Sequence, residues 1–385
     1  MADLLDGERE TVRALVGDQA GVWDRAGLLP LELLRKLGGL GLLSAQIPAA
    51  HGGRGADSRT NGEFTAYVGS LCSSLRSVMT SQGMAAWTVE RLGTREQHRA
   101  FLPGLSSGQL AAVGFSETDA GSDLSAIGTR IRRDGDSVVV DGAKRWITAS
   151  HYADLLVIVG QYDDGAAAVV IPADTPGVHV ERVAEPMGCR AAGHADLRFD
   201  SVRVPAENVL GGTGLPLPLV VTAALGYGRM SVAWGCVGIL RACLGAAATH
   251  AKGRQQFGKP IAEHQLVARH IAELYVSEQI ASRACEHASG RWDAKSPDMV
   301  VAAVTAKHIG AGHAARGAAA AVQVLASAGA QDGHVVARAY RDAKLMEIIE
   351  GSNEICQLIL SQHALSHAEC SNEGKNTTCP ANRTW

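Results

Sequence analysis

The chain has 385 residues, which allows two or three domains at the usual roughly 100 to 200 residues per domain. Its 36 Lys and Arg nearly balance its 39 Asp and Glu, giving a formal net charge of -3, and this excludes nucleic acid and an anionic membrane surface as main partners. Charged residues make up 19% of the chain, below the usual value of about 25%. We therefore expect extensive burial, part of it between the subunits of a homo-oligomer, either a dimer or a tetramer.

The cysteines and the start of the chain indicate a cytoplasmic protein with reduced thiols. The eight cysteines include no Cys-x-x-Cys pair, and the acidic beginning MADLLDGERE has no apolar run behind it. The longest apolar stretch, residues 215–225, is interrupted by Pro216 and Pro218 and is shorter than the roughly 20 residues that span a bilayer. The sequence therefore predicts no transmembrane helix.

The pattern of the first 212 residues changes near residue 110. Leucines recur at every third position between residues 28 and 37, and residues 91–105 have a helical period, so residues 1–110 are predicted to form an N-terminal α-helical domain. Residues 111–212 contain short β-branched runs separated by Asp- and Gly-rich turns, which predicts a central β domain. The expected strands are 137–140, 155–159, 167–171 and 178–183.

Helical periodicity returns at residue 213 and continues to residue 365 in long segments with short connections, which predicts a C-terminal four-helix bundle. Apolar stripes or alanine-rich runs mark its helices at 232–244, 267–281, 300–328 and 335–365. Residues 366–385 are rich in Ser, Asn and Thr without an apolar period, so we expect a disordered tail. The predicted fold class is α+β, mostly α.

Two motifs lie in or next to the predicted β domain. The segment FSETDAGSD starting at Phe115 fits an ordinary turn, or a site in which N–H groups around Gly121 and the hydroxyls of Ser116 and Ser122 bind an anionic or carbonyl-rich ligand.

The second motif is KRWIT, starting at Lys144. It reads as a strand that places Trp146 and Thr148 on one face. The indole of Trp146 fits either the core or the wall of a site for a planar ring.

The strongest candidate for chemistry is Glu350, which precedes a predicted helix break. On an unbroken helix Glu350 and Glu354 would stand one turn apart and repel each other. Gly351 can end one helix, and Ser352 can cap the next, with Glu354 in its first turn. Glu350 follows two isoleucines, so its carboxyl would be partly desolvated and its pKa raised, which suits proton abstraction. The alternative is an ordinary surface glutamate.

Several other site classes are disfavoured. The chain contains no Gly-x-Gly-x-x-Gly and no Gly-x-Ser-x-Gly, which argues against a Rossmann nicotinamide enzyme and an α/β-hydrolase. A near P-loop ends in Lys259-Pro260, where Ser or Thr would have to follow the Lys. His363 and His367 stand four apart without a Glu after the first, so we predict no metal site.

Four ordered segments together resemble the acyl-CoA dehydrogenase family of flavoproteins: SETDAGSD, KRWITAS, Arg254 to Ile261, and RDAKLMEIIEGSNEI. The resemblance covers roughly residues 10–365. It implies the three domains described above, with FAD bound between the β domain and the bundle and across a subunit interface.

The resemblance also implies roles for individual residues. Glu350 would be the catalytic base, and Ile349 would contact substrate at a position where the family often has Tyr. Arg254 and Phe257 would reach the FAD of a neighbouring subunit. The implied FAD contacts are Phe115, Ser116, Gly121, Ser122, Trp146, Thr148, Arg254, Phe257, Gln323, Ser352 and Glu354.

Residues 75–82 look like the helix with which glutaryl-CoA dehydrogenases hold a distal carboxylate, and Arg76 and Ser77 occupy the matching places. These two residues would therefore contact substrate. The alternative is that Arg76 pairs with a structural acid.

Four further segments are SLCSSLRSVMTSQGMAAW, GCRAAGHADL, SVAWGCVGILRAC and AYRDAKLMEIIEG. With them the chain more closely resembles the dehydrogenases of methoxymalonyl polyketide extender-unit biosynthesis, along almost its whole length. This resemblance implies an FAD-dependent enzyme that oxidises 2-hydroxy-3-oxopropionyl on an acyl carrier protein (ACP) to hydroxymalonyl. The alternative is α,β-desaturation of a short-chain acyl-CoA or acyl-ACP, and an alternative of another class is a flavin-binding scaffold without redox activity.

Overall fold

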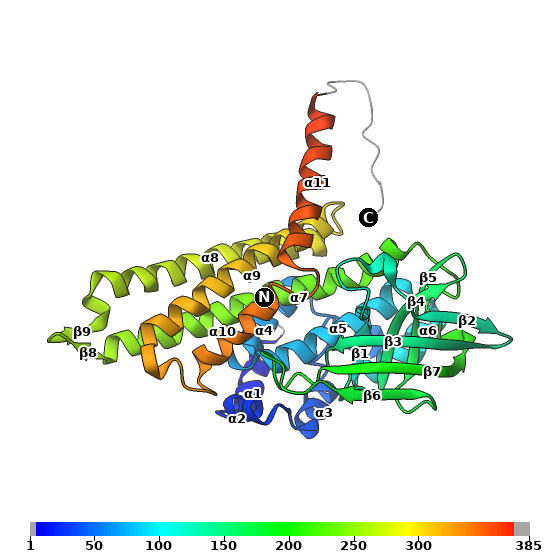
Figure 1. Cartoon of the computed structure of the whole chain (residues 1–385), viewed down its shortest axis with the longest axis horizontal. Coiled ribbons are helices and arrows are strands. Elements are labelled where there is room, and N and C mark those ends of the chain that lie inside the picture. The colour runs from blue at the N-terminus through cyan, green and yellow to red at the C-terminus, as the bar shows by residue number, and fades with distance from the viewer. Residues whose placement is uncertain (1–4, 373–385) are drawn as a thin grey trace.

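The computed structural model describes residues 5–372, which form a group of N-terminal helices, a β-sheet and a C-terminal helical bundle (Figure 1). The sheet lies at one end of the molecule. The long bundle helices extend away from it to a small hairpin of β8 (Gln255–Gln256) and β9 (Lys259–Pro260) at the other end. The predicted fold class, α+β and mostly α, is confirmed.

The N-terminal helices pack through buried apolar side chains, as the leucine period predicted. They are α1 (Asp6–Val16), α2 (Ala20–Ala26), α3 (Leu31–Gly39), α4 (Ser58–Leu71), α5 (Ser73–Leu92) and α6 (Arg95–Ser106). Helix α6 begins later than predicted because Thr94 and Gln97 form a capping box at its start. Helix α5 is buried along most of its length, because it packs against α7 (Leu217–Gly253) and β1 (Ala111–Gly114).

The predicted β-branched runs form a mixed sheet of seven strands. With β1 these are β2 (Arg130–Asp134), β3 (Ser137–Ile147), β4 (Leu155–Tyr162), β5 (Gly165–Pro172), β6 (Val178–Arg182) and β7 (Ala195–Pro205). The strand order is β1-β4-β2-β3-β7-β6, and β5 also pairs with β4. Strands β1 and β4 are parallel, whereas β2–β3 and β4–β5 are antiparallel hairpins closed by the predicted Asp- and Gly-containing turns.

The bundle is built around α7, which packs against α4, α5 and the other bundle helices. These are α8 (Gln265–Asp293), α9 (Met299–Leu325), α10 (Val335–Met346) and α11 (Asn353–Asn372). Short 3₁₀ turns lie at Ala49–His51, Leu124–Ala126, Ala206–Asn208, Ile261–Glu263 and Ala326–Ala328.

Helix α7 begins within the apolar stretch that the two prolines were expected to interrupt. Pro216 is its N-cap and Pro218 lies in its first turn, where a missing N–H breaks no helical hydrogen bond. By length and hydropathy α7 passes as a membrane span, but 72% of its most apolar window is buried inside the protein. It is therefore the core helix of the bundle.

The fourth bundle segment breaks where the sequence predicted. Helix α10 ends at Met346 and α11 begins at Asn353, with a turn between them. The expectation of a disordered tail is wrong for residues 366–372, which continue α11, because no Gly or Pro interrupts the sequence before Gly374. Residues 373–385 of the expected tail lie outside the described residues. Figure 1 shows α11 standing away from the body of the protein.

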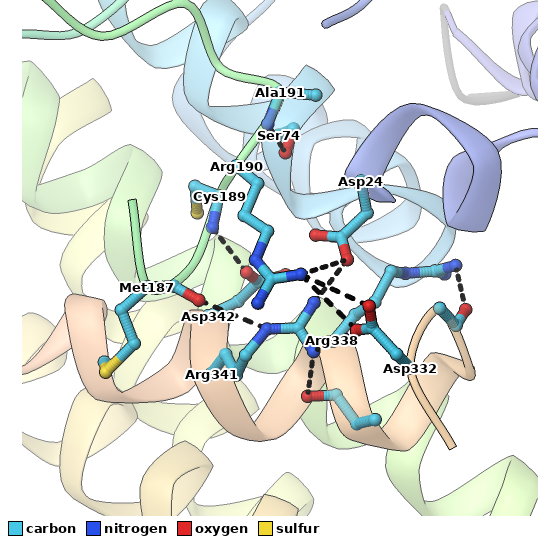
Figure 2. Close-up of polar contacts among 12 residues, drawn as sticks. Asp24, Ser74, Met187, Cys189, Arg190, Ala191, Asp332, Arg338, Arg341 and Asp342 are labelled. Carbon is cyan, nitrogen blue, oxygen red and sulfur yellow. Dashed lines mark hydrogen bonds and ion pairs between the residues drawn. The ribbon is translucent and has the colours of Figure 1, made fainter. Parts of the chain in front are cut away.

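A polar network fixes α10 against α2 and the loop of residues 186–194 (Figure 2). Arg341 on α10 forms an ion pair with Asp24 on α2, whose side chain is only 4% exposed. Asp342 is buried and accepts a hydrogen bond from the N–H of Cys189 at 2.6 Å. Because α10 leads directly into the turn before α11, the network also sets where that turn lies relative to the sheet.

Removing the charge of Asp24 should destabilise the fold. In Asp24→Asn the guanidinium of Arg341, 16% exposed, loses its buried anionic partner, a change that costs about 3 to 5 kcal/mol in comparable pairs. Asp332→Asn is the matched control, because Asp332 pairs with the same Arg341 at 3.3 Å but is 56% exposed, so its loss should cost about 1 kcal/mol or less. Chemical denaturation measures both losses, and equal values would contradict the role assigned to the buried pair.

Candidate active site

A cavity of about 1700 Å³ lies where the sheet, α5, α7 and the α10–α11 turn meet. It brings together most of the residues that the sequence singled out, although they come from widely separated parts of the chain. Those lining it are Arg76, Ser77, Phe115, Ser116, Gly121, Ser122, Trp146, Thr148, Ile349, Glu350 and Ser352.

The other four predicted residues lie outside the cavity wall. Arg254 and Phe257 belong to the β8–β9 hairpin region at the far end of the bundle, and Phe257 is 95% exposed. Gln323 is exposed on the last turns of α9, and Glu354 is exposed in the first turn of α11. In a single chain, therefore, these four are separate from the cavity.

Glu350 lies in the turn between α10 and α11 and turns its carboxyl group into the wall of the cavity. Its Oε2 is buried and has no hydrogen-bond partner within residues 5–372. Burial raises the pKa of this carboxyl above its ordinary value, an effect that the charges of Arg229, Lys307 and Arg76 only partly offset. The alternative of an ordinary surface glutamate is therefore wrong. A desolvated carboxylate with an unpaired oxygen can accept a proton from a bound molecule.

Gly228 on α7 leaves the space that this carboxyl group occupies. A Cβ at position 228 would overlap Glu350 Oε2 and would stand 2.7 Å from Met84 Sδ. The absence of a side chain here thus lets α7 pass directly beside the candidate base.

Arg76 on α5 is 1% exposed and lines the same cavity. Its Nη1 donates to Thr80 Oγ1 at 3.1 Å and its Nη2 contacts Met346 Sδ at 3.0 Å, but its Nε has no partner. No Asp or Glu oxygen in the described part of the chain lies within 4.0 Å of the guanidinium, so the alternative of pairing with a structural acid is wrong. A buried positive charge is therefore available to an anion bound in the cavity.

The loop of residues 115–129, which carries the predicted anion-binding backbone, is held by an internal ion pair. Lys144 Nζ donates to Glu117 Oε1 at 2.6 Å, and the Thr129 hydroxyl donates to the same oxygen at 2.6 Å. Burial acts to raise the pKa of Glu117, but these hydrogen bonds prevail and lower it, whereas burial lowers the pKa of Lys144 to about 8. A Cβ at Gly121 would meet no atom within 4 Å, so the backbone there is open to a ligand.

Trp146 and Thr148 line the cavity, but they are not neighbours on the face of a regular strand. The pairing of β3 with β7 shifts register after Lys144, and Trp146 has a left-handed φ of +58° in this irregular segment. The prediction that Trp146 and Thr148 share one face of a strand is wrong, because a local bulge and not the regular alternation of the strand sets the direction of the indole. Since Trp146 is 52% exposed, its indole is a cavity wall and not part of the core.

Three polar residues near the cavity were not identified from the sequence: His194, Arg229 and Lys307. His194 is 8% exposed, its ring lies 6.0 Å from that of Trp146, and its Nδ1 lies 3.2 Å from Thr148 Oγ1. Burial lowers the pKa of His194 to about 4, so its imidazole is neutral near pH 7. Arg229 and Lys307 are each a lone cation within an apolar helical run, and this pattern is the signal that could have identified them from the sequence.

Three family models match consecutive parts of the chain. They are the N-terminal domain of acyl-CoA dehydrogenase over residues 3–109, the middle domain over 112–202 and the C-terminal domain over 218–365. The chain therefore belongs to the acyl-CoA dehydrogenase family, and the predicted FAD dependence and oxidoreductase class are confirmed.

Individual relatives cover nearly the whole chain. The probable acyl-CoA dehydrogenase YngJ of Bacillus subtilis (strain 168) is 33% identical over 374 residues, 93% of this chain and 98% of that protein. The solved structure of FkbI, described as serving biosynthesis of the methoxymalonyl extender unit of the Fk520 polyketide immunosuppressant, is 64% identical with a TM-score of 0.90, covering 93% of this chain and 99% of that one. A glutaryl-CoA dehydrogenase from Mycobacterium smegmatis in complex with FADH2 is 25% identical with a TM-score of 0.86, covering 94% and 95%.

The residues present fit FAD. The open backbone at Gly121 can approach a phosphate, and the hydroxyls of Ser116, Ser122 and Thr148 line the cavity as hydrogen-bonding groups. The exposed indole of Trp146 offers an apolar wall to a planar ring.

Replacing Gly228 by Ala should lower turnover more than stability. The added methyl group overlaps the Glu350 carboxyl and forces it to move, and a misplacement of about 1 Å can cost about 100-fold in rate. Rapid-mixing measurements of flavin reduction give the rate, and thermal unfolding gives the stability.

The matched control is Gly245→Ala on the same helix, where an added Cβ meets no atom within 4 Å. It should leave the rate unchanged. Equal rates in the two variants would show that the space beside Glu350 does not matter for turnover.

Proposed function

We propose that this enzyme oxidises the 2-hydroxy-3-oxopropionyl group of an acyl carrier protein to hydroxymalonyl, a step toward a methoxymalonyl extender unit. The observation that carries the proposal is Arg76, a buried guanidinium with no carboxylate partner in the described structure, in the cavity that also contains the Glu350 carboxyl. A product with a new carboxylate matches that charge. The likeness to FkbI supports the pathway.

In this proposal the aldehyde reacts as its hydrate, formed by addition of water. Glu350 takes the proton from one hydroxyl group as the hydrogen on C3 leaves with its electron pair, and the carbon becomes a carboxylic acid, which then releases its own proton to water to form the carboxylate. FAD, when bound, supplies the acceptor for that hydride. Arg76 binds the carboxylate, Ser77 contacts the same end of the substrate, and Ile349 packs beside the acyl group.

The proposed cofactor contacts include residues of a second subunit. We propose a homo-oligomer, a dimer or a tetramer, in which Arg254 and Phe257 reach the FAD of the neighbouring subunit and Gln323 holds its adenosine half, with Ser352 and Glu354 as further contacts. The 95% exposure of the Phe257 ring supports this, as do large exposed apolar side chains along α8. Those on α8 are Leu266, Tyr275, Val276 and Ile280.

Mass spectrometry of the carrier protein distinguishes the proposed reaction from its alternative. With the carrier-bound aldehyde and no oxygen, the flavin should bleach and the acyl group should gain the mass of one oxygen atom. If instead only a saturated butyryl group on the carrier protein is oxidised, with the loss of two hydrogen atoms, the reaction is α,β-desaturation. The same two acyl groups offered as coenzyme A thioesters show whether the enzyme uses a carrier protein or coenzyme A. A flavin that no substrate bleaches would exclude an oxidoreductase role in this pathway.

Replacing Arg76 by Met should remove turnover of the carrier-bound aldehyde selectively. Met fills much of the same buried volume but carries no charge, so formation of the carboxylate should slow about 100-fold. The control is the same variant with a butyryl thioester, whose product has no new carboxylate and whose oxidation should change much less. Full activity of Arg76→Met on the aldehyde would remove the basis of the proposed substrate.

Glu350→Gln should abolish flavin reduction and should change stability in a pH-dependent way. Burial raises the pKa of Glu350, so its protonated form stabilises the fold below the ordinary value of 4.5, and this stabilisation is lost as the pH rises through the raised pKa. The always neutral glutamine should therefore unfold at a higher temperature than wild type at about pH 8, and this gain should shrink as the pH falls toward 4.5. A gain that does not vary with pH would mean that the carboxyl does not titrate as proposed.

A further inference from the structure

The turn that carries Glu350 is bonded by two buried cations from different helices. Lys307 Nζ on α9 donates to the carbonyl oxygen of Gly351 at 2.7 Å and reaches that of Glu347 at 3.5 Å. Arg229 Nε on α7 donates to the carbonyl oxygen of Glu350 itself at 3.1 Å. Three carbonyl groups of one short turn thus face positive charges.

Neither cation is explained by an ion pair. Lys307 is completely buried and Arg229 is 6% exposed, yet no carboxylate oxygen in the described part of the chain lies within 4.0 Å of either. Burying a charge without a counter-ion is costly. The compensation available here is a charge-assisted hydrogen bond to carbonyl groups at the C-terminal end of α10, where the helix dipole also favours positive charge.

The turn needs such support because its backbone is strained. Glu350 has a φ of +57° and Gly351 a φ of +88°. A left-handed conformation costs a residue with a side chain about 1 kcal/mol or more, and it persists only where the surroundings fix it.

We propose that Lys307 and Arg229 are positioning residues, which hold the backbone of the Glu350 turn so that its carboxyl group faces the cavity. The inference rests on the assignment of Glu350 as the base. Lys307 does not line the cavity, so it acts through the turn and not on the substrate.

The same two cations also act on the charge state of the base. The groups that face Glu350 are Arg229 from α7, Lys307 from α9 and Arg76 from α5, with the Cys356 thiol of α11 beside the two cations. All three cations lower the pKa of Glu350 and so oppose the larger effect of burial, while burial keeps Cys356 protonated by raising the pKa of its thiol. Loss of Lys307 should therefore move the pH at which the base ionises upward.

The test is Lys307→Met in the FAD-loaded enzyme, with flavin reduction followed across the pH range. In the plot of rate against pH, the rise on the acidic side should shift to higher pH by about one unit. The maximal rate should fall about tenfold or more with little change in substrate KM. A second readout without turnover is thermal unfolding against pH, where the loss of stability attributed to ionisation of Glu350 should move upward by a similar interval. Lys307→Arg keeps the charge and should restore much of both.

The matched control is Lys344→Met on α10, which removes the same charge near the turn from a side chain that is 60% exposed and donates to the Glu347 carboxylate. It should leave both the pH–rate profile on its acidic side and the maximal rate unchanged. If Lys307→Met does not fold, Arg229→Lys decides, because it keeps a charge but loses the Nε hydrogen bond and should lower the maximal rate without a large shift of the pH–rate profile.

The assignment of Glu350 as the base and the positioning role of Lys307 can be refuted separately. If Glu350→Gln still reduces the flavin, the base is misassigned. If Glu350→Gln is inactive but Lys307→Met only lowers the unfolding temperature and leaves the pH–rate profile and the maximal rate in place, Lys307 is merely structural and the inference is overturned.

Discussion

A carboxyl group removed from water, in a turn whose backbone conformation is unfavourable by itself, is the constraint on which this structure depends. The Glu350 side chain is set between α5, α7 and α9, and each of these helices contributes one buried cation: Arg76, Arg229 and Lys307. Together the charges oppose, but do not cancel, the effect of burial on its pKa. Close approach of these helices is possible because glycines replace larger side chains beside Glu350 and Arg76, at Gly228 and Gly235.

Helix α10 fixes the two sides of the cavity relative to each other. Through Arg341 and Asp342 it is fixed to α2 and to the loop of residues 186–194 (Figure 2). That loop ends at His194, which lines the cavity. The C-terminal end of the same helix carries the Glu350 turn. One rigid element therefore relates the candidate base to the sheet side of the site, and an error in its placement would move both.

The sequence was sufficient where the determining interactions are local. The helix break at Glu350 follows from a helix-ending Gly351 and a capping Ser352, and the domain order follows from the change of period between helices and strands. The continuation of α11 to Asn372 was missed because polar composition does not prevent a helix. The orientation of Trp146 depends on a register shift between β3 and β7, which no property of its own segment specifies.

Long-range features of the site could not be obtained from the sequence in the same way. Whether Arg76 has a carboxylate partner depends on which helices meet α5, so both alternatives remained open until the fold was available. Lys307 and Arg229 stand about 80 residues apart in the chain and bond a turn more than 40 residues beyond the nearer one, so only the folded bundle brings them together. A charged residue in an apolar stripe indicates that its charge is buried and has a polar partner, but it does not identify that partner.

The charges that line the cavity favour one of the two candidate oxidations over the other. Desaturation of a thioester and oxidation of an aldehyde hydrate both remove one proton and one hydride from neighbouring atoms, so a buried base serves either reaction. The two differ in the charge that they leave behind, since only the second creates a carboxylate. Three buried cations surround a single carboxyl group here, and Arg76 has an unpaired Nε in the cavity wall. An apolar acyl chain would leave the Nε of this guanidinium without a hydrogen-bond partner, whereas the carboxylate of the proposed product would accept a hydrogen bond from it, so the charges of the cavity support the proposed acid-forming reaction over desaturation.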